Sequence, residues 1–358
     1  MSSGSQKDLP TIGITIGDLN GIGPEIIIKA FADDRFHNLC RPIIYASAQT
    51  LIYHKKLINN RHFNFNVIDS ADKAQYKKIN VVNAWQDEVK IEIGEPSNAT
   101  GKAALASIKT AVADYKNGLL DAIVTAPINK KTVQQAGMDF PGHTEFFASE
   151  FDSDQYLMLL VGERMKVAVV TGHIPLSEVS NELSKKRVLK AIKALNKSLN
   201  EDFSHERPSI AVLGLNPHAG ENGTMGDEEE ESIQPAMEEA KRQGINVQGP
   251  YPPDGFFGTG MYHNFDAVLC MYHDQGLIPF KLLEFDTGVN YTAGLPLIRT
   301  SPDHGTAYAI AGKNAANPQS MVEAIYLALK IKKSRNVHAE ITADPLGAKM
   351  EKQKDRDS

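Results

Sequence analysis

The sequence has few cysteines and lacks long apolar runs, and both shortages narrow the class of protein. Its two cysteines, Cys40 and Cys270, lie far apart beside apolar residues, so we expect buried thiols rather than a disulfide framework. No apolar segment approaches the roughly 20 residues that cross a bilayer, and the polar first residues lack the basic and then apolar order of a signal peptide. The sequence therefore predicts a cytoplasmic protein without membrane contacts.

An excess of basic charge and low-complexity segments are also absent. The formal net charge is −6, which argues against extended nucleic-acid binding but allows a local basic pocket for a small anion. No low-complexity tract or repeat of fixed period is visible. Because 358 residues exceed the size at which one hydrophobic core stops growing, we expect a globular protein of two lobes.

Short apolar runs alternate along the chain with amphipathic helical patterns. A β-branched run at 11–16 is followed by a glycine-rich turn and a helical pattern that starts at Pro24. Further runs of strand length lie at 42–46, 120–125, 166–171, 209–215 and 267–271, and helical patterns cover 102–116, 184–199 and 318–332. This alternation predicts an α/β fold with a largely parallel sheet or sheets. The charged tail from Lys349 onward is expected to fray.

Three histidines follow predicted buried strands directly. His173, His218 and His273 come just beyond the runs 167–170, 210–215 and 267–271. Because the carboxyl ends of strands line the ligand crevice of open α/β sheets, we expect these imidazoles to converge there. Three imidazoles with an open fourth position are typical of a catalytic divalent metal site. Their spacings of 45 and 55 residues match no local metal motif, so surface or core-edge histidines remain the alternative.

Residues suited to an anion occur in two places. His143 and Thr144 lie at the start of a helical pattern, where backbone N–H groups and the threonine hydroxyl can face a phosphate. A helix cap explains the same residues about equally well. Lys281, Asn290 and Arg299 bracket a segment poor in other charges, and charged donors of this kind suit phosphate or carboxylate. The alternative for each of them is a solvated surface residue.

Two further motifs indicate less. Residues 17–25 form a tight turn into a helix, but they lack the G-x-G-x-x-G order of a dinucleotide-binding turn. The acidic run at 227–231 is compatible with a metal site. The first turn of a helix, where the helix dipole favours acidic residues, explains this run better.

Six segments together carry a resemblance to a known family. In chain order they are GDLNGIGPE at 17–25, TAPINK at 125–130, FPGHTE at 140–145, LNPHAGE at 215–221, YHDQG at 272–276 and SPDHGT at 301–306. The set resembles the 4-hydroxythreonine-4-phosphate dehydrogenase (PdxA) family of pyridoxine biosynthesis, and the resemblance covers nearly the whole chain. The first segment has Asp-Leu-Asn-Gly where the family more usually has Asp-Pro-Ala-Gly.

The resemblance implies a fold similar to that of isocitrate and isopropylmalate dehydrogenases. Such subunits are two-lobed and α/β/α, and they form a homodimer whose active site lies in the interdomain cleft at the dimer interface. By this resemblance, residues 1–136 and 286–358 form a discontinuous cofactor-binding lobe. Residues 137–285 form the central lobe for metal, substrate and dimerisation. Neither a nucleic acid nor a membrane is an implied partner.

The resemblance also implies a metal and a phosphorylated substrate. One divalent metal ion, which is zinc, cobalt, magnesium or manganese, is assigned to a site completed across the dimer, with His273 presented to the cleft of the partner subunit. Its implied ligands are His173, His218 and His273. The positions that match the family's substrate-binding residues are His143, Thr144, Lys281, Asn290 and Arg299.

The cofactor and the proton acceptor are less specific. Residues 304–318 resemble the adenosine-binding loop of isopropylmalate dehydrogenase, which explains how NAD or NADP could bind without the glycine-rich fingerprint. The positions assigned to this cofactor are His304, Gly305, Thr306 and Asn317. The proton acceptor remains open among Lys281, Asp274 and Asp254, with Asp274 alternatively orienting the neighbouring histidine.

The implied reaction is the NAD(P)-dependent, metal-dependent oxidation of 4-phosphohydroxy-L-threonine to 2-amino-3-oxo-4-(phosphooxy)butanoate. This product decarboxylates to 3-amino-2-oxopropyl phosphate, in pyridoxal 5'-phosphate biosynthesis. Relatives of the family act on D-threonate or D-erythronate 4-phosphate, or on aromatic cis-dihydrodiols. Lys281, Asn290 and Arg299 favour a phosphate over a dihydrodiol. A catalytically silent metal- or phosphate-binding protein on the same scaffold is the remaining alternative.

Overall fold

The computed structural model describes residues 9–32, 35–140, 142–154 and 156–343, and their elements alternate between strand and helix. The strands are β1 Thr11–Thr15, β2 Arg41–Ala46, β3 Asn66–Ile68, β4 Asn80–Asn83, β5 Ala122–Thr125, β6 Leu157–Val161, β7 Lys166–Thr171, β8 Ser209–Leu213, β9 Asn246–Tyr251, β10 Ala267–Tyr272, β11 Val289–Ala293 and β12 Arg299–Pro302. The helices are α1 Gly23–Ala30, α2 Phe36–Leu39, α3 Ala48–Leu57, α4 Asn98–Lys116, α5 Lys130–Gln135, α6 His143–Glu150, α7 Val179–Glu182, α8 Lys185–Glu201, α9 Gln234–Arg242, α10 Pro253–Gly258, α11 His273–Glu284 and α12 Gln319–Ala343. The predicted α/β class is confirmed, and the predicted tail from Lys349 lies outside the described residues.

The strands form one sheet in the order β3-β4-β2-β1-β5-β12-β11-β6-β7-β10-β8-β9. The six strands from β3 to β12 are parallel to one another, as are the four strands from β7 to β9. Strand β11 pairs antiparallel with both β12 and β6, and β6 pairs antiparallel with β7. The sheet is thus largely parallel, as predicted, with a reversal of strand direction at its centre.

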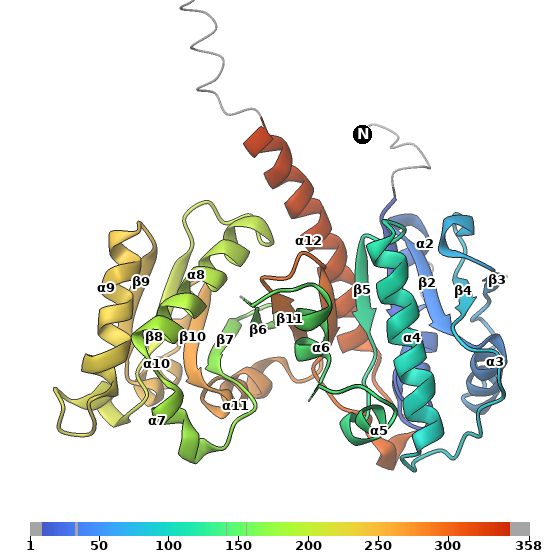
Figure 1. The fold of residues 1–358 in the computed structure, drawn as a ribbon, viewed down its shortest axis with the longest axis horizontal. Coiled ribbons are helices and arrows are strands. Elements are labelled where there is room, and N and C mark those ends of the chain that lie inside the picture. Colours follow the sequence, from blue (N-terminus) through green and yellow to red (C-terminus); the bar gives the residue numbers. More distant parts are fainter. Residues whose placement is uncertain (1–8, 33–34, 141, 155, 344–358) are drawn as a thin grey trace, which may run out of the picture.

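Strands β1 and β5 are buried along their whole length. Burial on both faces is typical of interior strands in a parallel sheet. The same pattern of continuous burial covers most of β2, β7, β8 and β10. Helices cover both faces of the sheet, with α1 to α4 around the amino-terminal strands and α8 to α10 around the strands at the other end (Figure 1). Two groups of parallel strands, each with its helices, therefore flank the antiparallel centre. The lobe boundaries at 136/137 and 285/286 stay a prediction.

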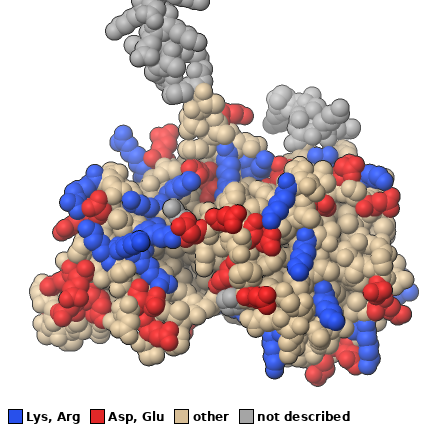
Figure 2. Space-filling view, viewed as in Figure 1, with Lys and Arg blue, Asp and Glu red and all other residues tan. Residues whose placement is uncertain are grey.

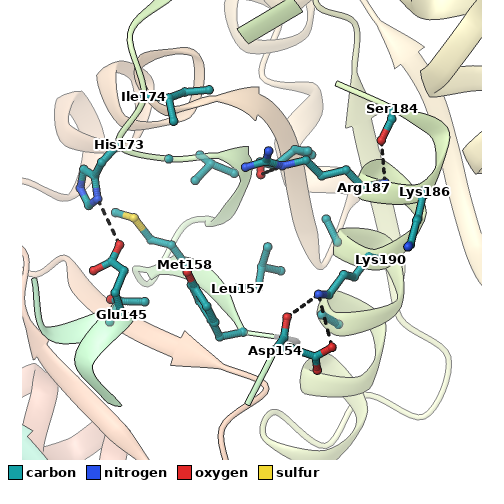
Figure 3. Close-up of a pocket in the computed structure, with 17 residues that line it drawn as sticks. Glu145, Asp154, Leu157, Met158, His173, Ile174, Ser184, Lys186, Arg187 and Lys190 are labelled. Atoms are coloured by element: carbon teal, nitrogen blue, oxygen red, sulfur yellow. Dashed lines mark hydrogen bonds and ion pairs between the residues drawn. The ribbon is translucent and has the colours of Figure 1, made fainter. Parts of the chain in front are cut away.

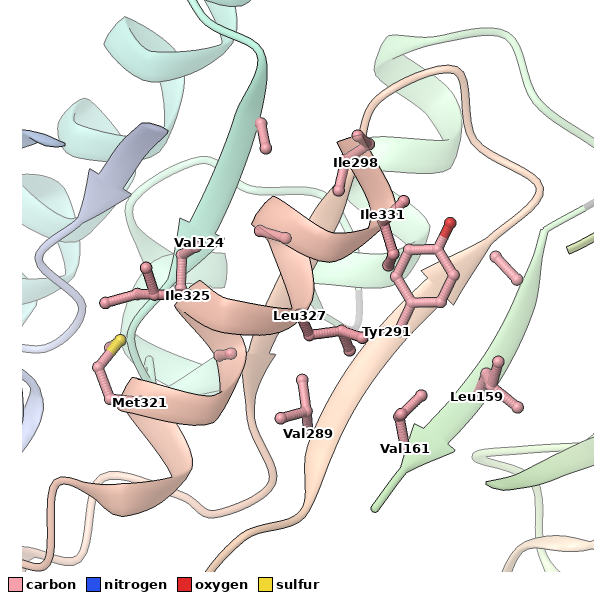
Figure 4. Packing of buried hydrophobic residues seen from close by; sticks show 14 of the residues in the cluster. Val124, Leu159, Val161, Val289, Tyr291, Ile298, Met321, Ile325, Leu327 and Ile331 are labelled. Atoms are coloured by element: carbon pink, nitrogen blue, oxygen red, sulfur yellow. The ribbon is translucent and has the colours of Figure 1, made fainter. Parts of the chain in front are cut away.

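Helix α12 packs across the centre of the sheet. It contacts β12, β5 and β11, and its side chains Met321, Ile325, Leu327 and Ile331 lie on these strands (Figure 4). Burying apolar area of this kind contributes about 25 cal/mol per Å². The helix therefore covers the centre of the sheet, where β11 and β12 carry site residues.

The structure agrees with two expectations from composition. Cys40 and Cys270 are free and buried, and burial raises the pKa of the Cys40 thiol to about 12. Within the described ranges, none of the helices combines the length and the hydropathy required to cross a membrane.

Candidate active site

Arg299 is a buried cation at the first position of β12. Its side chain is 3% exposed. Nε and Nη2 donate to Thr125 Oγ1 at 3.1 and 2.7 Å, and Nη1 donates to Thr292 Oγ1 at 3.4 Å. Burial lowers the pKa of Arg299 to about 9, while Glu145 acts in the opposite direction. Among the described residues no carboxylate forms an ion pair with Arg299. A buried guanidinium held by neutral hydroxyls is typical of a site that an anionic ligand completes.

A cavity of about 250 Å³ adjoins this guanidinium. Its lining includes all of the predicted substrate-binding residues, which are His143, Thr144, Lys281, Asn290 and Arg299. They come from the start of α6, from α11, from β11 and from β12. In the described part of the chain, Asn290 Oδ1 and His143 Nε2 are buried without a hydrogen-bond partner. Unsatisfied buried polar atoms are rare in native proteins, and a bound ligand is one of the ways in which they are satisfied.

His143 is held as a neutral imidazole. Burial lowers its pKa well below the usual range, and the nearby charges of Arg299 and Lys130 lower it further. The ring stacks on Phe147, one turn later in α6, with the ring centroids 6.2 Å apart. The imidazole therefore offers a hydrogen bond to a ligand beside Arg299 without adding a positive charge.

Lys281 contacts Asp303, a residue that the sequence did not single out. Lys281 Nζ lies 3.5 Å from Asp303 Oδ2 and 3.4 Å from the Asp303 carbonyl oxygen. Burial raises the pKa of Asp303, and Lys281 opposes that shift. Both residues line the cavity. The available signal was the position of Asp303 at a strand end within the SPDHGT motif, immediately before His304.

The other two predicted proton acceptors, Asp274 and Asp254, do not line this cavity. Asp274 Oδ1 is 2.6 Å from Nδ1 of His273, so it contacts a predicted metal ligand. Asp254 is an exposed residue on α10, and it lines neither this cavity nor the larger one described below. Its catalytic role remains a prediction.

Two of the three predicted metal ligands are neighbours. Strands β7 and β10 pair side by side, and the rings of His173 and His273, which follow them, have centroids 5.6 Å apart. His173 Nδ1 lies 3.7 Å from Glu145 Oε1, and the contact with His173 is the main cause that lowers the pKa of Glu145. Each histidine thus has a carboxylate near Nδ1, which leaves Nε2 available. This donor arrangement fits a divalent metal ion, whose histidine ligands commonly bond a carboxylate through the second ring nitrogen.

His218 does not join this pair within the chain. It lies in the 3-10 turn η3, Pro217–Gly220, and lines a separate cavity of about 430 Å³. Strand β8 adjoins β10, but the loop after β8 has left-handed backbone angles at His218 and Ala219. In the part of the chain that the structure describes, no group of three His, Cys, Asp or Glu side chains could hold a metal. The three-histidine site therefore remains a prediction.

A larger cavity of about 520 Å³ also has His173 and Glu145 in its lining (Figure 3). Met158 of β6 and Lys190 and Arg187 of α8 line it, and Lys190 and Arg187 pair with Asp154 and Glu182, respectively. Basic side chains gather over α8 (Figure 2). Because Thr144, Glu145 and His173 line both cavities, His173 lies where the two cavities meet.

The predicted cofactor residues lie on the loop between β12 and α12. His304 and Gly305 line the cavity beside Arg299. The Thr306 carbonyl accepts a hydrogen bond from Ile22 N at 3.0 Å. Asn317 Nδ2 donates to Asp286 Oδ1 at 3.2 Å. The structure thus brings two of the four positions to the cavity and the other two to structural contacts.

This loop packs on the glycine-rich turn that follows β1. Tyr308 Oη donates to Asp18 Oδ2 at 2.7 Å. A Cβ atom on Gly21 would lie 2.7 Å from the Thr306 carbonyl oxygen, so only glycine fits there. Asn20, where the sequence departs from the family motif, is fully buried. Its side chain donates to the Glu95 carbonyl at 2.6 Å and accepts from Glu92 N at 2.9 Å. The departure therefore has a structural role in anchoring residues 92–95.

Comparisons with known proteins agree with this arrangement. Residues 38–328 match the model of the family described as pyridoxal phosphate biosynthetic protein PdxA. The 4-hydroxythreonine-4-phosphate dehydrogenase of Bacteroides thetaiotaomicron is 46% identical over 336 residues, which cover 94% of this chain and 92% of that protein. A putative D-threonate 4-phosphate dehydrogenase of Oceanobacillus iheyensis is 39% identical over 332 residues, which cover 90% of this chain and 98% of that protein.

Solved structures give the same result. The crystal structure of 4-hydroxythreonine-4-phosphate dehydrogenase from Klebsiella pneumoniae superposes with a TM-score of 0.80 at 40% identity, covering 91% of this chain and 98% of that one. The family resemblance of the six sequence motifs is thereby confirmed over most of the chain. This chain belongs to the PdxA family of pyridoxal phosphate biosynthetic proteins.

Proposed function

We propose that this chain is a 4-hydroxythreonine-4-phosphate dehydrogenase. It oxidises the secondary hydroxyl of 4-phosphohydroxy-L-threonine to the ketone of 2-amino-3-oxo-4-(phosphooxy)butanoate, with the hydride passing to NAD or NADP. The resulting β-keto acid loses carbon dioxide and takes up a proton, giving 3-amino-2-oxopropyl phosphate. The observation that carries the proposal is the buried Arg299, which has no carboxylate partner among the described residues and lies in the same cavity lining as His173.

Arg299 and Lys281 bind the phosphate of the substrate. Both are charged donors at one cavity, and charge-assisted hydrogen bonds to phosphate are among the strongest in proteins. Asn290 Oδ1 and His143 Nε2 also lack partners there; because an amide oxygen accepts hydrogen bonds, Asn290 Oδ1 suits the hydroxyl or ammonium group of the substrate and not its phosphate. Holding the phosphate fixes the rest of the substrate relative to the histidine pair, which converts binding energy into orientation of the reacting carbon.

His173 and His273 of one chain would hold a divalent metal ion, since their rings are neighbours; His218 of the partner subunit would complete the site, in place of His273, which the sequence alone assigned to the partner's cleft. Such an ion, when bound, would lower the pKa of the reacting hydroxyl and stabilise negative charge on its oxygen. Glu145 and Asp274 orient the two imidazoles through their Nδ1 atoms. Lys281, one of the three predicted proton acceptors, lines the cavity and is assigned here to the phosphate as a charged donor, so the identity of the proton acceptor stays a prediction.

A homodimer with shared active sites explains why the histidines are incomplete in one chain. Helix α11 begins at His273 and carries Ile278 and Leu282, with Phe285 just beyond its end. These side chains are 59%, 81% and 72% exposed. At this spacing they form one apolar stripe, and exposed apolar surface of this kind marks interaction sites. A second copy of the chain that covers the stripe would approach the site at His273.

Changing Leu282 to glutamate is therefore expected to dissociate the dimer and to abolish turnover. A charge in an apolar interface is not compensated on burial. Light scattering after size-exclusion chromatography would report the mass, and NAD(P) reduction the activity. The same change at Ile341, which is 69% exposed near the end of α12, is the control and should leave the mass unchanged. An unaltered mass for Leu282→Glu would contradict this interface.

The substrate is tested by comparing NAD(P) reduction with three compounds in the presence of divalent metal. They are 4-phosphohydroxy-L-threonine, D-threonate 4-phosphate and D-erythronate 4-phosphate. Sugar-acid 4-phosphates are the second candidate substrate class, because the relative from Oceanobacillus iheyensis is a putative D-threonate 4-phosphate dehydrogenase. We expect the highest kcat/KM with the amino acid. A clear preference for a sugar acid would replace the proposed function with the second candidate, and no hydride transfer with any of them would leave a silent binding protein.

A further inference from the structure

The loop that presents His218 has an unusual backbone. His218, Ala219, Glu221 and Asn222 have φ values of 54°, 51°, 43° and 54°. Side chains other than glycine rarely adopt these left-handed angles, and a run of them persists only where the surroundings enforce it. Contacts from residues outside the loop must therefore stabilise this backbone conformation.

The carboxylate of Glu229 holds the start of this loop. It is 1% exposed, and it begins a π-helical turn, η4, Glu229–Ile233. Its Oε1 accepts hydrogen bonds from Leu215 N at 2.7 Å and Asn216 N at 2.8 Å, and its Oε2 accepts from Asn216 Nδ2 at 3.0 Å. No ion pair of Glu229 with a basic side chain occurs in the described ranges. A buried carboxylate of this kind depends on these donors for its stability.

Both ends of the loop close onto the same carboxylate. A Cβ atom on Gly214 would lie 3.0 Å from Glu229 Oε1, and one on Gly220 would lie 2.7 Å from Oε2. Gly220 also has a φ of 83°. The loop is therefore shaped around Glu229, and neither glycine leaves room for a side chain.

A second buried side chain ties this loop to the strand that carries His273. Gln275 Nε2 donates to the Gly214 carbonyl at 2.7 Å, and Gln275 Oε1 accepts from Met271 N at 2.7 Å. Thr171 Oγ1 in turn donates to the Met271 carbonyl at 2.8 Å. Side-chain hydrogen bonds thus link the three segments that directly precede His173, His273 and His218.

We infer that Glu229 is a positioning residue, which fixes the loop so that His218 is presented in one geometry to a metal ion. Both carboxylate oxygens accept hydrogen bonds from the loop, so Glu229 acts through His218 rather than as a ligand. The acidic run 227–231 therefore does more than complement a helix dipole, because one of its members supports the loop. This inference rests on the proposed function, in which His218 is a metal ligand.

The test uses Glu229→Gln in the full-length protein. The amide has one acceptor oxygen, so when that oxygen accepts from Leu215 N and Asn216 N, its NH₂ group faces the donor Asn216 Nδ2 and at least one of the hydrogen bonds is lost. We expect the affinity of the metal-free protein for Co²⁺, measured by calorimetry and by the visible absorption of the bound ion, to fall by roughly 10- to 100-fold. Binding of inorganic phosphate, a probe of the pocket at Arg299, should be unchanged. With saturating Co²⁺, kcat should recover while KM stays near the wild-type value.

Glu231→Gln is the matched control, because Glu231 is exposed on the same turn. It should bind Co²⁺ as the wild type does. If Glu229→Gln fails to fold, Gly220→Ala decides, since the added methyl group presses on the carboxylate and should weaken Co²⁺ binding in the same way. Unchanged Co²⁺ affinity in a folded variant would overturn the inference. Absence of Co²⁺ binding by the wild type would instead overturn the metal assignment of the proposed function, and the inference with it.

Discussion

Replacing Arg299 with methionine is expected to abolish turnover of the phosphorylated substrate and to raise the melting temperature of the ligand-free protein. Losing one partner of a buried charged contact costs about 2–5 kcal/mol of binding free energy. Without an anion, the guanidinium is a buried cation that donates to two threonine hydroxyls and lies 6.0 Å from the centroid of the Phe147 ring. A hydrophobic side chain of similar length relieves that desolvation penalty. Thermal unfolding and NAD(P) reduction measure the two effects.

Inorganic phosphate provides a third measurement on the same variant. It should raise the melting temperature of the wild type, because a ligand that binds only the folded state stabilises that state. The Arg299→Met variant should not respond. A wild type that is unaffected by phosphate would argue against the anion site itself.

Arg335→Met is the matched control for this prediction. Arg335 Nε donates to Asp202 Oδ1 at 2.7 Å, and Asp202 is 3% exposed. This change removes a partner from a buried ion pair, so we expect it to destabilise the protein by about 3–5 kcal/mol. Phosphate should still stabilise it, since Arg335 lies outside the Arg299 cavity. If both methionine variants lowered the melting temperature alike, the interpretation of Arg299 as an uncompensated cation would be wrong.

Combining two inactive subunits is expected to restore activity when one carries His173→Ala and the other His218→Ala. If His173 and His273 of one chain meet His218 of the partner subunit, one of the two sites in this heterodimer has every ligand intact. The purified heterodimer, selected with two different affinity tags, should therefore show about half of the wild-type activity. Each homodimeric variant should be inactive.

The control heterodimer carries His173→Ala in one chain and His273→Ala in the other. Because these two rings lie 5.6 Å apart in the same chain, each site of this heterodimer lacks one of them. No activity should return. Equal recovery in both heterodimers, or none in either, would contradict a site in which only His218 crosses the interface.

The strands that the sequence predicted are those buried on both faces. The runs 11–16, 42–46, 120–125, 166–171, 209–215 and 267–271 correspond to β1, β2, β5, β7, β8 and β10. They were visible because such strands consist of continuous apolar residues. Strands β11 and β12 were not identified, since they carry Asn290, Arg299 and other polar residues. Their polarity belongs to the site, and functional sites are where local sequence patterns conflict with the fold.

The site shows the same division. Local reasoning placed His173 and His273 at strand ends, and the structure brings these two together. Local reasoning identified His143, Lys281 and Arg299 as suited to an anion, but their gathering around one cavity depends on long-range packing, so only the family resemblance implied a shared site. The left-handed loop that turns His218 to another cavity has no sequence signature apart from its glycines. Asp303 was missed although it follows a strand within the SPDHGT motif, because its contact with Lys281 depends on long-range packing.

The unbroken sheet limits how the two ends of the molecule can move relative to each other. Backbone hydrogen bonds run from β3 to β9 without a gap, so the outer parts cannot slide past each other as separate bodies. Any relative motion of the two ends is expected to twist the sheet about its central antiparallel strands. Asn290 and Arg299 lie on the paired strands β11 and β12, near the axis of that torsion. The phosphate end of the substrate would then stay fixed while the protein around the histidines moves relative to it.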